Sequence, residues 1–394
     1  MIIKPKIRSN FFANAHPLGV KETLSKQFDE ALASPNYNGP TNVLIIGGSS
    51  GYGLASRITL AINGGANTVN VSLESQPKNT RSGSAGFWNN HYFKQFAQKT
   101  HKAHLDVDGD AFLSSTKQTV IKKLKETIGQ IDLLIYSLAA PARVDESTNK
   151  TVRSAIKTIG EDISGHTIDI AKKTIVPLHV EAATNKEIDD TVFVMGGSDW
   201  KAWVEALDEA SLIAEGFKTI AYTYIGGDTT HKIYRGGTLG KAKADLEHTS
   251  KLLHASLSQE HHGEALVASS KAVVTKASVF IPQMPIYASC LFEVMQNQGL
   301  HETIVEHKHR LFHDMVYGKK RHVDASGRIR VDHLEMRADV QEETLALMEK
   351  HSDSSLFNLE GTKLFLQEAY TMNGFGHPNI DYNVAINIEQ LLKT

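Results

Sequence analysis

Thr41–Ala61 reads TNVLIIGGSSGYGLASRITLA, in which a short apolar run precedes a glycine cluster and a helical pattern. The run Val43–Ile46 is typical of a strand buried on both faces of a parallel sheet. Glycine permits a turn with φ > 0 and lets a phosphate approach backbone N–H groups, and a helix that opens near Gly51 points its positive end at that anion. The stretch therefore predicts a dinucleotide site, which would include Gly47, Gly48, Ser49, Ser50, Gly51 and Tyr52.

The spacing of the glycines indicates which kind of nucleotide-binding site this stretch forms. Gly47-x3-Gly51-x-Gly53 differs from the G-x-G-x-x-G form and lacks the Gly-Lys-Ser/Thr ending of a nucleoside-triphosphate loop. We therefore expect a short-chain-reductase type of site and discard an ATPase. Strand-like runs at 43–46, 68–73, 103–107 and 131–136 alternate with helical patterns, which predicts βαβ units in a parallel sheet.

The predicted fold class is α/β, a Rossmann-like doubly wound parallel sheet of the short-chain-reductase kind with extra N-terminal, lid and C-terminal helical elements. We expect one large domain over 1–394, with a dinucleotide-binding and catalytic core at 41–280 and a lid or hairpin at 142–185. Helical substrate-side and C-terminal elements would fill 281–394. We also expect a short strand at Ile2–Ile7 and a helix that ends near Ala33.

Composition excludes several classes of protein. A net charge of -2 gives no general attraction to nucleic acid or anionic lipid, and no apolar run approaches the eighteen residues of a membrane helix. Cys290 is the single cysteine, so a disulfide within the chain and a cysteine zinc cluster are both impossible. His301 and His307 stand six apart and do not share a helix face, so we expect no metal site. The N-terminus lacks a signal pattern, which favours the cytoplasm.

Two carboxylates after the glycine turn, Glu74 and Asp110, are candidates for binding the adenosine half of the cofactor. Glu74 ends the second strand-like run, where a carboxylate can accept hydrogen bonds from both ribose hydroxyls and repel the 2′-phosphate of NADP. NADH is therefore the expected cofactor, although Lys78 and Arg81 leave NADPH as a weaker alternative. Asp110 can bind the adenine amino group or cap a helix that begins at Ala111.

Small residues follow the fourth strand-like run, at Ser137–Pro141. They allow a cofactor ring to lie against the backbone, and the proline fixes the exit of the chain.

The second informative stretch is IYRGGTLGKAKADL, residues 233–246. A phenol beside an ammonium suits a reductase, because the phenol can donate to an enolate oxygen while the lysine holds the ribose of the nicotinamide. With Leu239 at zero, Lys243 falls at about 40° on the apolar face of a helix, whereas Lys241 falls at about 200°. Tyr234 must then stand in a loop ahead of a helix that begins near Thr238, whose hydroxyl would be the N-cap.

The chain resembles the FabV-type trans-2-enoyl-CoA/acyl-carrier-protein reductases over essentially its whole length. The resemblance lies in motifs such as GGSSGYGLASRI, DGDAF, IYSLA, VMGGSDW, KAVVTKAS and NGFGHPNIDYN, together with the Tyr-x8-Lys spacing. It implies NADH-dependent reduction of the 2,3 double bond of an enoyl thioester on CoA or acyl-carrier protein, the last step of fatty-acid elongation, by a monomer. It further implies that Tyr234 is the proton donor, Lys243 binds the cofactor ribose and Tyr224 touches the substrate.

By position, the resemblance also implies that these residues line the cofactor: Leu73, Glu74, Asp110, Ala111, Leu138, Ala139, Lys243, Ala272, Val273 and Val274. Two positions depart from the family: Lys276 replaces a common glutamine and Ala142 a common arginine. Each tyrosine also has a plain alternative as a packed aromatic. A short-chain alcohol or ketone dehydrogenase and a non-catalytic NAD-binding protein remain the competing functions.

Overall fold

The computed structural model describes residues 1–393, and its centre is a seven-stranded parallel sheet in the order β13-β12-β11-β6-β3-β4-β5. The strands are β3 (Asn42–Ile46), β4 (Asn67–Ser72), β5 (His104–Asp108), β6 (Ile131–Tyr136), β11 (Ile213–Thr223), β12 (Glu264–Ser269) and β13 (Arg328–Arg330). From β3 the chain adds β4 and β5 on one side and then crosses to β6 on the other. The carboxyl ends of β3 and β6 therefore flank the switch point at which such sheets bind ligands.

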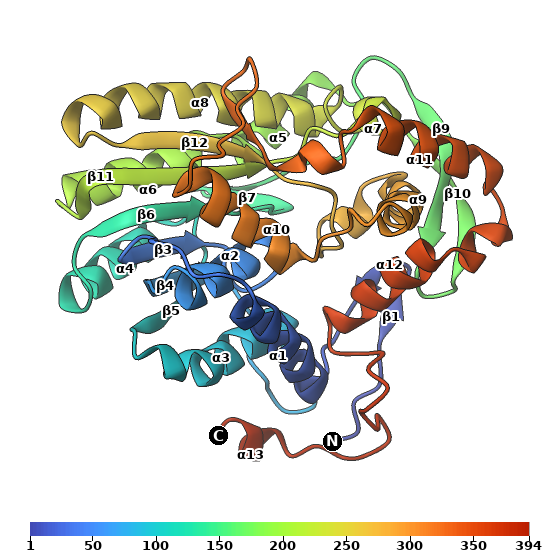
Figure 1. Ribbon diagram of the computed structural model, residues 1–394, viewed down its shortest axis with the longest axis horizontal. Coiled ribbons are helices and arrows are strands. Elements are labelled where there is room, and N and C mark those ends of the chain that lie inside the picture. Colours follow the sequence, from blue (N-terminus) through green and yellow to red (C-terminus); the bar gives the residue numbers. More distant parts are fainter. Residues whose placement is uncertain (394) are drawn as a thin grey trace.

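Helices cover both faces of this sheet (Figure 1). Leu44 and Ile46 point to the layer of α4 (Ser114–Glu126), α6 (Ser198–Glu209) and α8 (Thr238–Glu260). Val43 and Ile45 point to the layer of α2 (Gly51–Ile62) and α10 (Ile304–Arg310), and α1 (Pro17–Ala33) and α3 (Ala85–Ala97) pack against α2. The continuous apolar run of β3 is explained by burial on both faces, which confirms the predicted fold class.

The remaining elements lie largely beyond the carboxyl ends of the strands, where Figure 1 shows α9, α11, α12 and the β9–β10 hairpin grouped together. Residues 142–185 form two antiparallel hairpins, β7 (Ala142–Asp145) with β8 (Lys150–Arg153) and β9 (Ile163–Asp169) with β10 (Thr174–Val180). The remaining helices are α5 (Asn185–Met195), α7 (Asp228–His231), α9 (Met284–Asn297), α11 (Ala338–Lys350) and α12 (Glu360–Thr371), whereas α13 (Ile388–Leu391) lies apart from this group and packs near α3. Within residues 1–393 no helix has the length and apolarity needed to cross a bilayer.

The two ends of the chain differ from the sequence prediction. The strand predicted at Ile2–Ile7 is wrong, because β1 spans only Ile7–Arg8 and pairs with β2 (Phe11–Phe12). The first residue pairs instead with the C-terminal segment, since the amide of Ile386 donates to the Met1 carbonyl at 2.8 Å. At the other end, β13 extends the sheet from a segment expected to be helical. Such distant partners leave no periodic signal in the sequence.

A buried ion pair joins α4 to α6 near the carboxyl end of β6. Lys117 Nζ donates to Asp199 Oδ1 at 2.7 Å and to the Ala111 carbonyl at 3.0 Å, and the Tyr136 hydroxyl donates to Asp199 Oδ2 at 3.1 Å. Burial raises the pKa of Asp199, and the Lys117 charge opposes that shift. The carboxylate is therefore stable in the core only while its partners remain.

We expect Lys117→Met to lower the free energy of unfolding by about 3–5 kcal/mol, because it strands a buried charge. The matched control is Lys122→Met on the same helix, where an exposed lysine stands 3.9 Å from Glu126. That change should cost no more than about 0.5 kcal/mol. Urea denaturation of both variants measures the difference, and equal losses would contradict the assigned importance of the buried pair.

Candidate active site

The glycine turn between β3 and α2 has the geometry that phosphate binding requires. Gly47 and Gly51 have φ of +87° and +54°, and α2 begins at Gly51 as predicted. A Cβ at Gly47 would overlap the carbonyl oxygen of Ser137, the residue that follows β6. The first turn of a helix leaves N–H groups without intrahelical partners, so this one presents donors at the switch point of the sheet.

A network of buried hydrogen bonds fixes the conformation of the glycine turn. The Gly48 amide donates to Asn70 Oδ1 at 2.8 Å, and Asn70 Nδ2 donates to Asp106 Oδ1 at 3.0 Å. Arg57 of α2 donates to the same carboxylate oxygen at 2.8 Å, and its guanidinium lies 3.9 Å from the centre of the Phe93 ring. Burial alone would raise the pKa of Asp106, but Arg57 and its other partners lower it overall, so the carboxylate stays ionised.

Glu74 lies against the turn, as the cofactor prediction requires. Its carboxylate accepts from Ser49 Oγ at 2.6 Å and from Ser84 Oγ at 2.5 Å. Ser84 is the N-cap of α3, and Leu73 beside Glu74 exposes 69% of its surface. A carboxylate and an open apolar side chain therefore stand together where the ribose and adenine were expected.

Asp110 has a different local role from the helix cap considered in the sequence. α4 begins at Ser114 rather than Ala111, and Asp110 Oδ1 accepts from the Phe112 amide at 3.0 Å in the preceding turn. The neighbouring Asp108 contacts Glu74, because its Oδ1 accepts from the Glu74 amide at 3.3 Å. Ala111 is buried, and its carbonyl accepts from Lys117 and from the Trp203 ring at 3.1 Å.

Two of the sequence segments assigned to the cofactor share one cavity of about 310 Å³. Its lining includes Ser50 and Gly51 from the turn and Val273 and Val274 from the loop after β12. Leu138 Cδ2 stands 3.3 Å from a Cβ placed on Gly47, while Ala139 is exposed beyond it. The positive-φ turn, the open helix start and Glu74 together fit a nicotinamide dinucleotide.

Tyr234 stands in the loop ahead of α8, as predicted. Its carbonyl accepts from the amides of Gly237 at 3.1 Å and Gly240 at 2.9 Å, which ties the loop to the first turn of the helix. The ring is 8% exposed, and burial raises the pKa of its phenol, so the group is neutral and keeps its proton.

The predicted N-cap at Thr238 is wrong, because Gly237 occupies the cap position. Thr238 Oγ1 donates instead to the Ala155 carbonyl at 2.5 Å and accepts from the Lys157 amide at 3.2 Å. These bonds fix the start of α8 to the segment between β8 and β9. The prediction failed because the Thr238 hydroxyl bonds to the Ala155 carbonyl, a tertiary partner that the local sequence does not indicate.

The two lysines of α8 face opposite ways, which confirms the helix-face prediction. Lys243 Nζ donates to the Tyr222 carbonyl on β11 at 3.2 Å, whereas Lys241 is exposed. Burial lowers the pKa of Lys243 to about 8, and the nearby Glu247 carboxylate opposes that shift. The ammonium therefore lies at the end of the strand that also leads to Tyr224.

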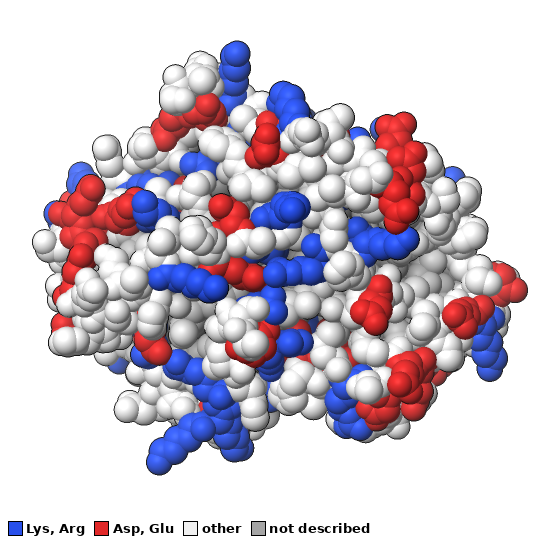
Figure 2. Space-filling view, turned by 90° about the horizontal axis from the view of Figure 1, so that it is seen from above, with Lys and Arg blue, Asp and Glu red and all other residues white. Residues whose placement is uncertain are grey.

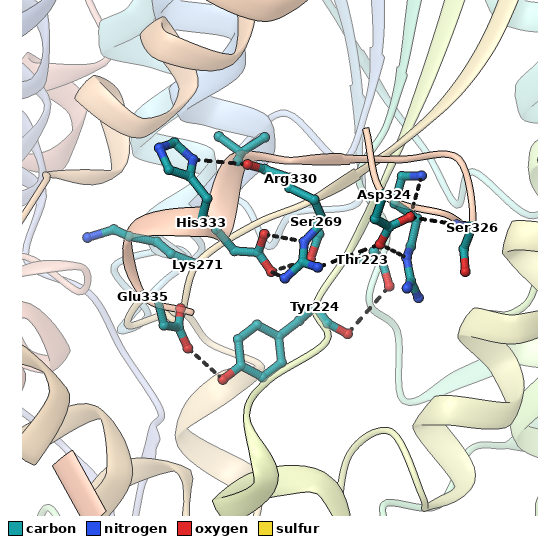
Figure 3. A network of polar contacts seen from close by, with 12 residues as sticks. Thr223, Tyr224, Ser269, Lys271, Asp324, Ser326, Arg330, His333 and Glu335 are labelled. Atoms are coloured by element: carbon teal, nitrogen blue, oxygen red, sulfur yellow. Dashed lines mark hydrogen bonds and ion pairs between the residues drawn. The ribbon is translucent and has the colours of Figure 1, made fainter. Parts of the chain in front are cut away.

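Tyr224 and Tyr234 are brought together, with ring centroids 4.8 Å apart in an edge-to-face arrangement. The Tyr224 hydroxyl donates to Glu335 Oε1 at 2.9 Å, as Figure 3 shows, and the Tyr287 hydroxyl donates to the same oxygen at 2.8 Å. The Ala272 amide donates to Glu335 Oε2 at 2.6 Å. Tyr224 is thus fixed by its hydroxyl, and its ring packs against Tyr234.

Glu335 is the principal residue that the sequence analysis missed. It is fully buried, and burial raises the pKa of its carboxyl to about 7 against the hydrogen bonds that lower it. It follows the short helix η4 (Val331–Leu334), in the segment 281–394 for which the sequence analysis expected helical elements and named individually only Cys290, His301 and His307. No motif marks it; only the three donors that converge on it from β11, α9 and the loop after β12 reveal its place.

Comparison with known proteins places the chain in a family. Residues 81–317 match a family model described as the trans-2-enoyl-CoA reductase catalytic region, and residues 2–79 match the NAD(P)H binding domain of trans-2-enoyl-CoA reductase. The chain belongs to the trans-2-enoyl-CoA reductase family. The sequence is 40% identical over 388 residues to an enoyl-[acyl-carrier-protein] reductase [NADH] of Burkholderia ambifaria, covering 98% of this chain and 97% of the relative.

Solved structures agree with that assignment. The fold matches Clostridium acetobutylicum trans-2-enoyl-CoA reductase in complex with NADH at a TM-score of 0.96 and 40% identity, covering 100% of this chain and 99% of that one. It matches the Treponema denticola trans-2-enoyl-CoA reductase in complex with NAD at a TM-score of 0.90 and 37% identity, covering 98% of each chain.

A third family model, described as an enoyl reductase FAD binding domain, matches residues 323–386. The residues of this segment do not form a second dinucleotide turn. A Cβ at Gly361 would overlap the backbone of α9 at Ser289 and Glu293, so this glycine serves the packing of α12 on α9. The segment's only strand, β13, is followed by η4 and by Glu335, and it lacks a glycine-rich turn into a helix. The residues of this segment therefore do not fit a flavin dinucleotide.

We expect Glu335→Gln to lower the free energy of unfolding by about 1–3 kcal/mol, because an amide cannot accept from all three donors and leaves one of them unpaired. The control is Glu343→Gln, at an exposed position of α11, which should change stability by less than about 0.5 kcal/mol. Urea denaturation measures this loss as a shift in the midpoint of unfolding, provided that the m-value stays the same. Equal midpoints for wild type and Glu335→Gln would refute the role given to this carboxyl.

Proposed function

We propose that this chain catalyses the NADH-dependent reduction of the 2,3 double bond of a trans-2-enoyl thioester to the saturated acyl thioester. The observation that carries the proposal is the arrangement at the end of β11, where the buried Tyr234 phenol ahead of α8 packs against Tyr224 and the inward Lys243 ammonium donates to the Tyr222 carbonyl. Membership of the trans-2-enoyl-CoA reductase family supports the same reaction.

In this mechanism the residues stabilise charge that develops on the substrate. When bound, NADH supplies a hydride to C3 of the enoyl group. The carbonyl oxygen then gains enolate charge, and the neutral Tyr234 phenol donates a hydrogen bond to it. An interaction that strengthens as charge develops lowers the barrier, whereas one that binds substrate and transition state equally does not. The enolate then takes a proton at C2, for which the family resemblance implies Tyr234 as the donor, and this completes the saturated thioester.

Lys243 and Glu74 are assigned to the two ends of the cofactor. Lys243, whose pKa is lowered to about 8, is still mainly protonated at pH 7 and can donate to the hydroxyls of the nicotinamide ribose. Glu74 can accept from the adenosine ribose hydroxyls and repel a 2′-phosphate, which favours NADH over NADPH. Tyr224 is assigned to the substrate side, with Glu335 as its positioning residue.

The acyl group can arrive on CoA or on acyl-carrier protein, because both present a thioester to the same site. The relatives divide between the two carriers, since the Burkholderia ambifaria protein is an enoyl-[acyl-carrier-protein] reductase and the Clostridium protein a trans-2-enoyl-CoA reductase. We further propose that the protein acts as a monomer in the cytoplasm, as the family resemblance implies.

The competing function is a short-chain type of alcohol or ketone dehydrogenase, which also uses a tyrosine and a lysine. We expect wild type to oxidise NADH with crotonyl thioesters and not with simple ketones.

Tyr234→Phe should lower kcat by about 10²–10⁴-fold, because the enolate loses its donor, while NADH still binds. Stopped-flow absorbance and NADH fluorescence measure the two effects, and retained turnover in this variant would remove the role of Tyr234.

Lys243→Met should weaken NADH binding and turnover together by at least about tenfold, because one charged hydrogen-bond donor to the ribose is lost. Lys241→Met is the matched control two residues away on the exposed face and should leave both quantities near wild type. Steady-state kinetics with varied NADH test the pair, and the reverse order of effects would overturn the assignment of the inward lysine.

A further inference from the structure

The hydrogen bonds around Glu335 determine which of its oxygens can carry a proton. Oε2 faces the Ala272 amide at 2.6 Å, and an amide N–H donates but does not accept. Oε1 accepts from the Tyr224 hydroxyl at 2.9 Å and from the Tyr287 hydroxyl at 2.8 Å, and a hydroxyl oxygen can also accept. A proton on this carboxyl therefore lies on Oε1 and points to one of the two phenols.

Tyr287 cannot take up that proton without losing its own hydrogen bond. Gln341 Nε2 donates to the Tyr287 hydroxyl at 2.9 Å and to the Glu335 backbone carbonyl at 2.8 Å, which fixes both residues. The Tyr287 ring is fully buried, so a Tyr287 hydrogen that turned away from Oε1 would be left unpaired in the core. The proton on Oε1 consequently donates to Tyr224, and the hydrogen of Tyr224 must then turn away from Glu335.

The two tyrosines of the site differ in what their hydroxyls contact. Within residues 1–393 the Tyr234 hydroxyl forms no hydrogen bond, so its hydrogen is free to point at a substrate. The Tyr224 hydrogen is bound to Glu335 as long as that group is a carboxylate. The two rings lie edge to face with centroids 4.8 Å apart, so a released Tyr224 hydrogen lies beside the phenol assigned to the substrate carbonyl.

The cations near Glu335 are bound to other groups. Arg330 Nε donates to Asp332 Oδ1 at 2.8 Å, and Lys271 Nζ donates to the Glu302 carbonyl. Neither cation forms an ion pair with Glu335, although both experience its charge. The titratable and charged groups that face Glu335 are Tyr224 from β11, Tyr287 from α9, Tyr52 from α2, Asp332 from η4, Lys271 from the loop after β12 and Arg330 from β13 (Figure 3).

Glu335 therefore differs from the acidic groups at the surface. On the face shown in Figure 2, acidic side chains lie among basic ones. Glu335 has no such partner within residues 1–393, and burial is the main cause that raises its pKa to about 7. The Asp332 charge adds to that rise, while the hydrogen bonds from Ala272 and the two phenols oppose it. Both protonation states are consequently populated near neutral pH.

We propose that Glu335 is a positioning residue of the reaction whose protonated form turns the Tyr224 hydroxyl toward the substrate carbonyl, which gives the developing enolate a second donor beside Tyr234. This inference rests on the proposed function. While Glu335 is ionised, the Tyr224 hydrogen stays on the carboxylate, and the buried negative charge also opposes the charge of the enolate. No bond to Glu335 forms or breaks in turnover: its proton stays on Oε1, and the proton added at C2 still comes from Tyr234.

The proposal predicts the direction of the pH dependence. Activity is highest where Glu335 is protonated and falls as the pH rises through its pKa of about 7. We expect kcat with saturating NADH and crotonyl-CoA to fall about tenfold between about pH 6 and about pH 8, as a single ionisation requires. Lys243, whose pKa is about 8, also loses its charge as the pH rises, so variants must separate the two groups.

The test compares the pH profile of kcat in Glu335→Gln with that of wild type. The amide nitrogen of the glutamine donates to Tyr224 at every pH, as the protonated carboxyl does, so this variant should lose the step near pH 7 and keep the later fall. In a Tyr224→Phe background, Glu335→Gln should leave the profile unaltered, because the hydroxyl through which Glu335 acts is absent. The matched control Tyr287→Phe removes the other phenol on the same oxygen and should keep the step, with its midpoint moved upward.

A merely structural carboxyl would give a different result. Glu335→Gln would then be less active by the same factor at every pH, with the profile of wild type, and this outcome would overturn the proposal. If wild type reduces no enoyl thioester at any pH, the proposed function and this inference fall together. A turnover whose pH profile does not depend on Glu335 removes the inference alone.

A spectroscopic titration of wild type does not depend on the folding of any variant. Infrared difference spectra should show the C=O band of a buried protonated carboxyl disappear over the same pH range as the fall in kcat. Folded Glu335→Gln or, failing that, the shifted midpoint in Tyr287→Phe assigns the band to Glu335. A carboxyl band that stays constant between about pH 6 and about pH 8 while kcat falls would contradict the assigned role.

Discussion

The hydrogen bond from the Gly48 amide to Asn70 is the constraint on which the cofactor side of the structure depends. It links the turn after β3 to the neighbouring strand β4, and through Asp106 to β5 and Arg57. A glycine turn with positive φ is intrinsically free to move. Here a chain of buried, charge-assisted bonds selects one conformation, so phosphate-binding donors are in place before a ligand arrives.

The same principle applies at the proposed substrate side, where Glu335 is the central group. An unpaired carboxyl in the core would be costly, but three donors from separate elements converge on this one. Nearby, Ser269 Oγ donates to Asp332 Oδ2 at 2.8 Å and Arg330 Nε donates to Asp332 Oδ1 at 2.8 Å; Figure 3 shows where Ser269 and Arg330 lie. β13 and η4 are thereby attached to the catalytic end of the sheet, although they come from the last fifth of the chain.

Burial of the Lys243 ammonium removes part of its hydration, and this links its place in the fold to its proposed role. Its ammonium is held at the Tyr222 carbonyl, and burial lowers its pKa because few groups replace the lost water. Ribose hydroxyls would supply such groups. A partly desolvated ammonium gains more from a polar ligand than an exposed one would, so the inward position of Lys243 suits the ribose contact that we propose.

The sequence by itself determined the elements whose signals are local. Periodicity located β3, β6 and α8, glycine chemistry located the turn, and helix geometry separated Lys243 from Lys241, because each of these depends on residues within a few turns of one another. Only the tertiary structure decided that Met1 pairs with Ile386, that Thr238 bonds to Ala155 instead of capping its helix, and that β13 completes the sheet. Glu335 belongs with these: a buried carboxyl is identified by the donors around it, and those donors lie 48 to 111 residues away along the chain.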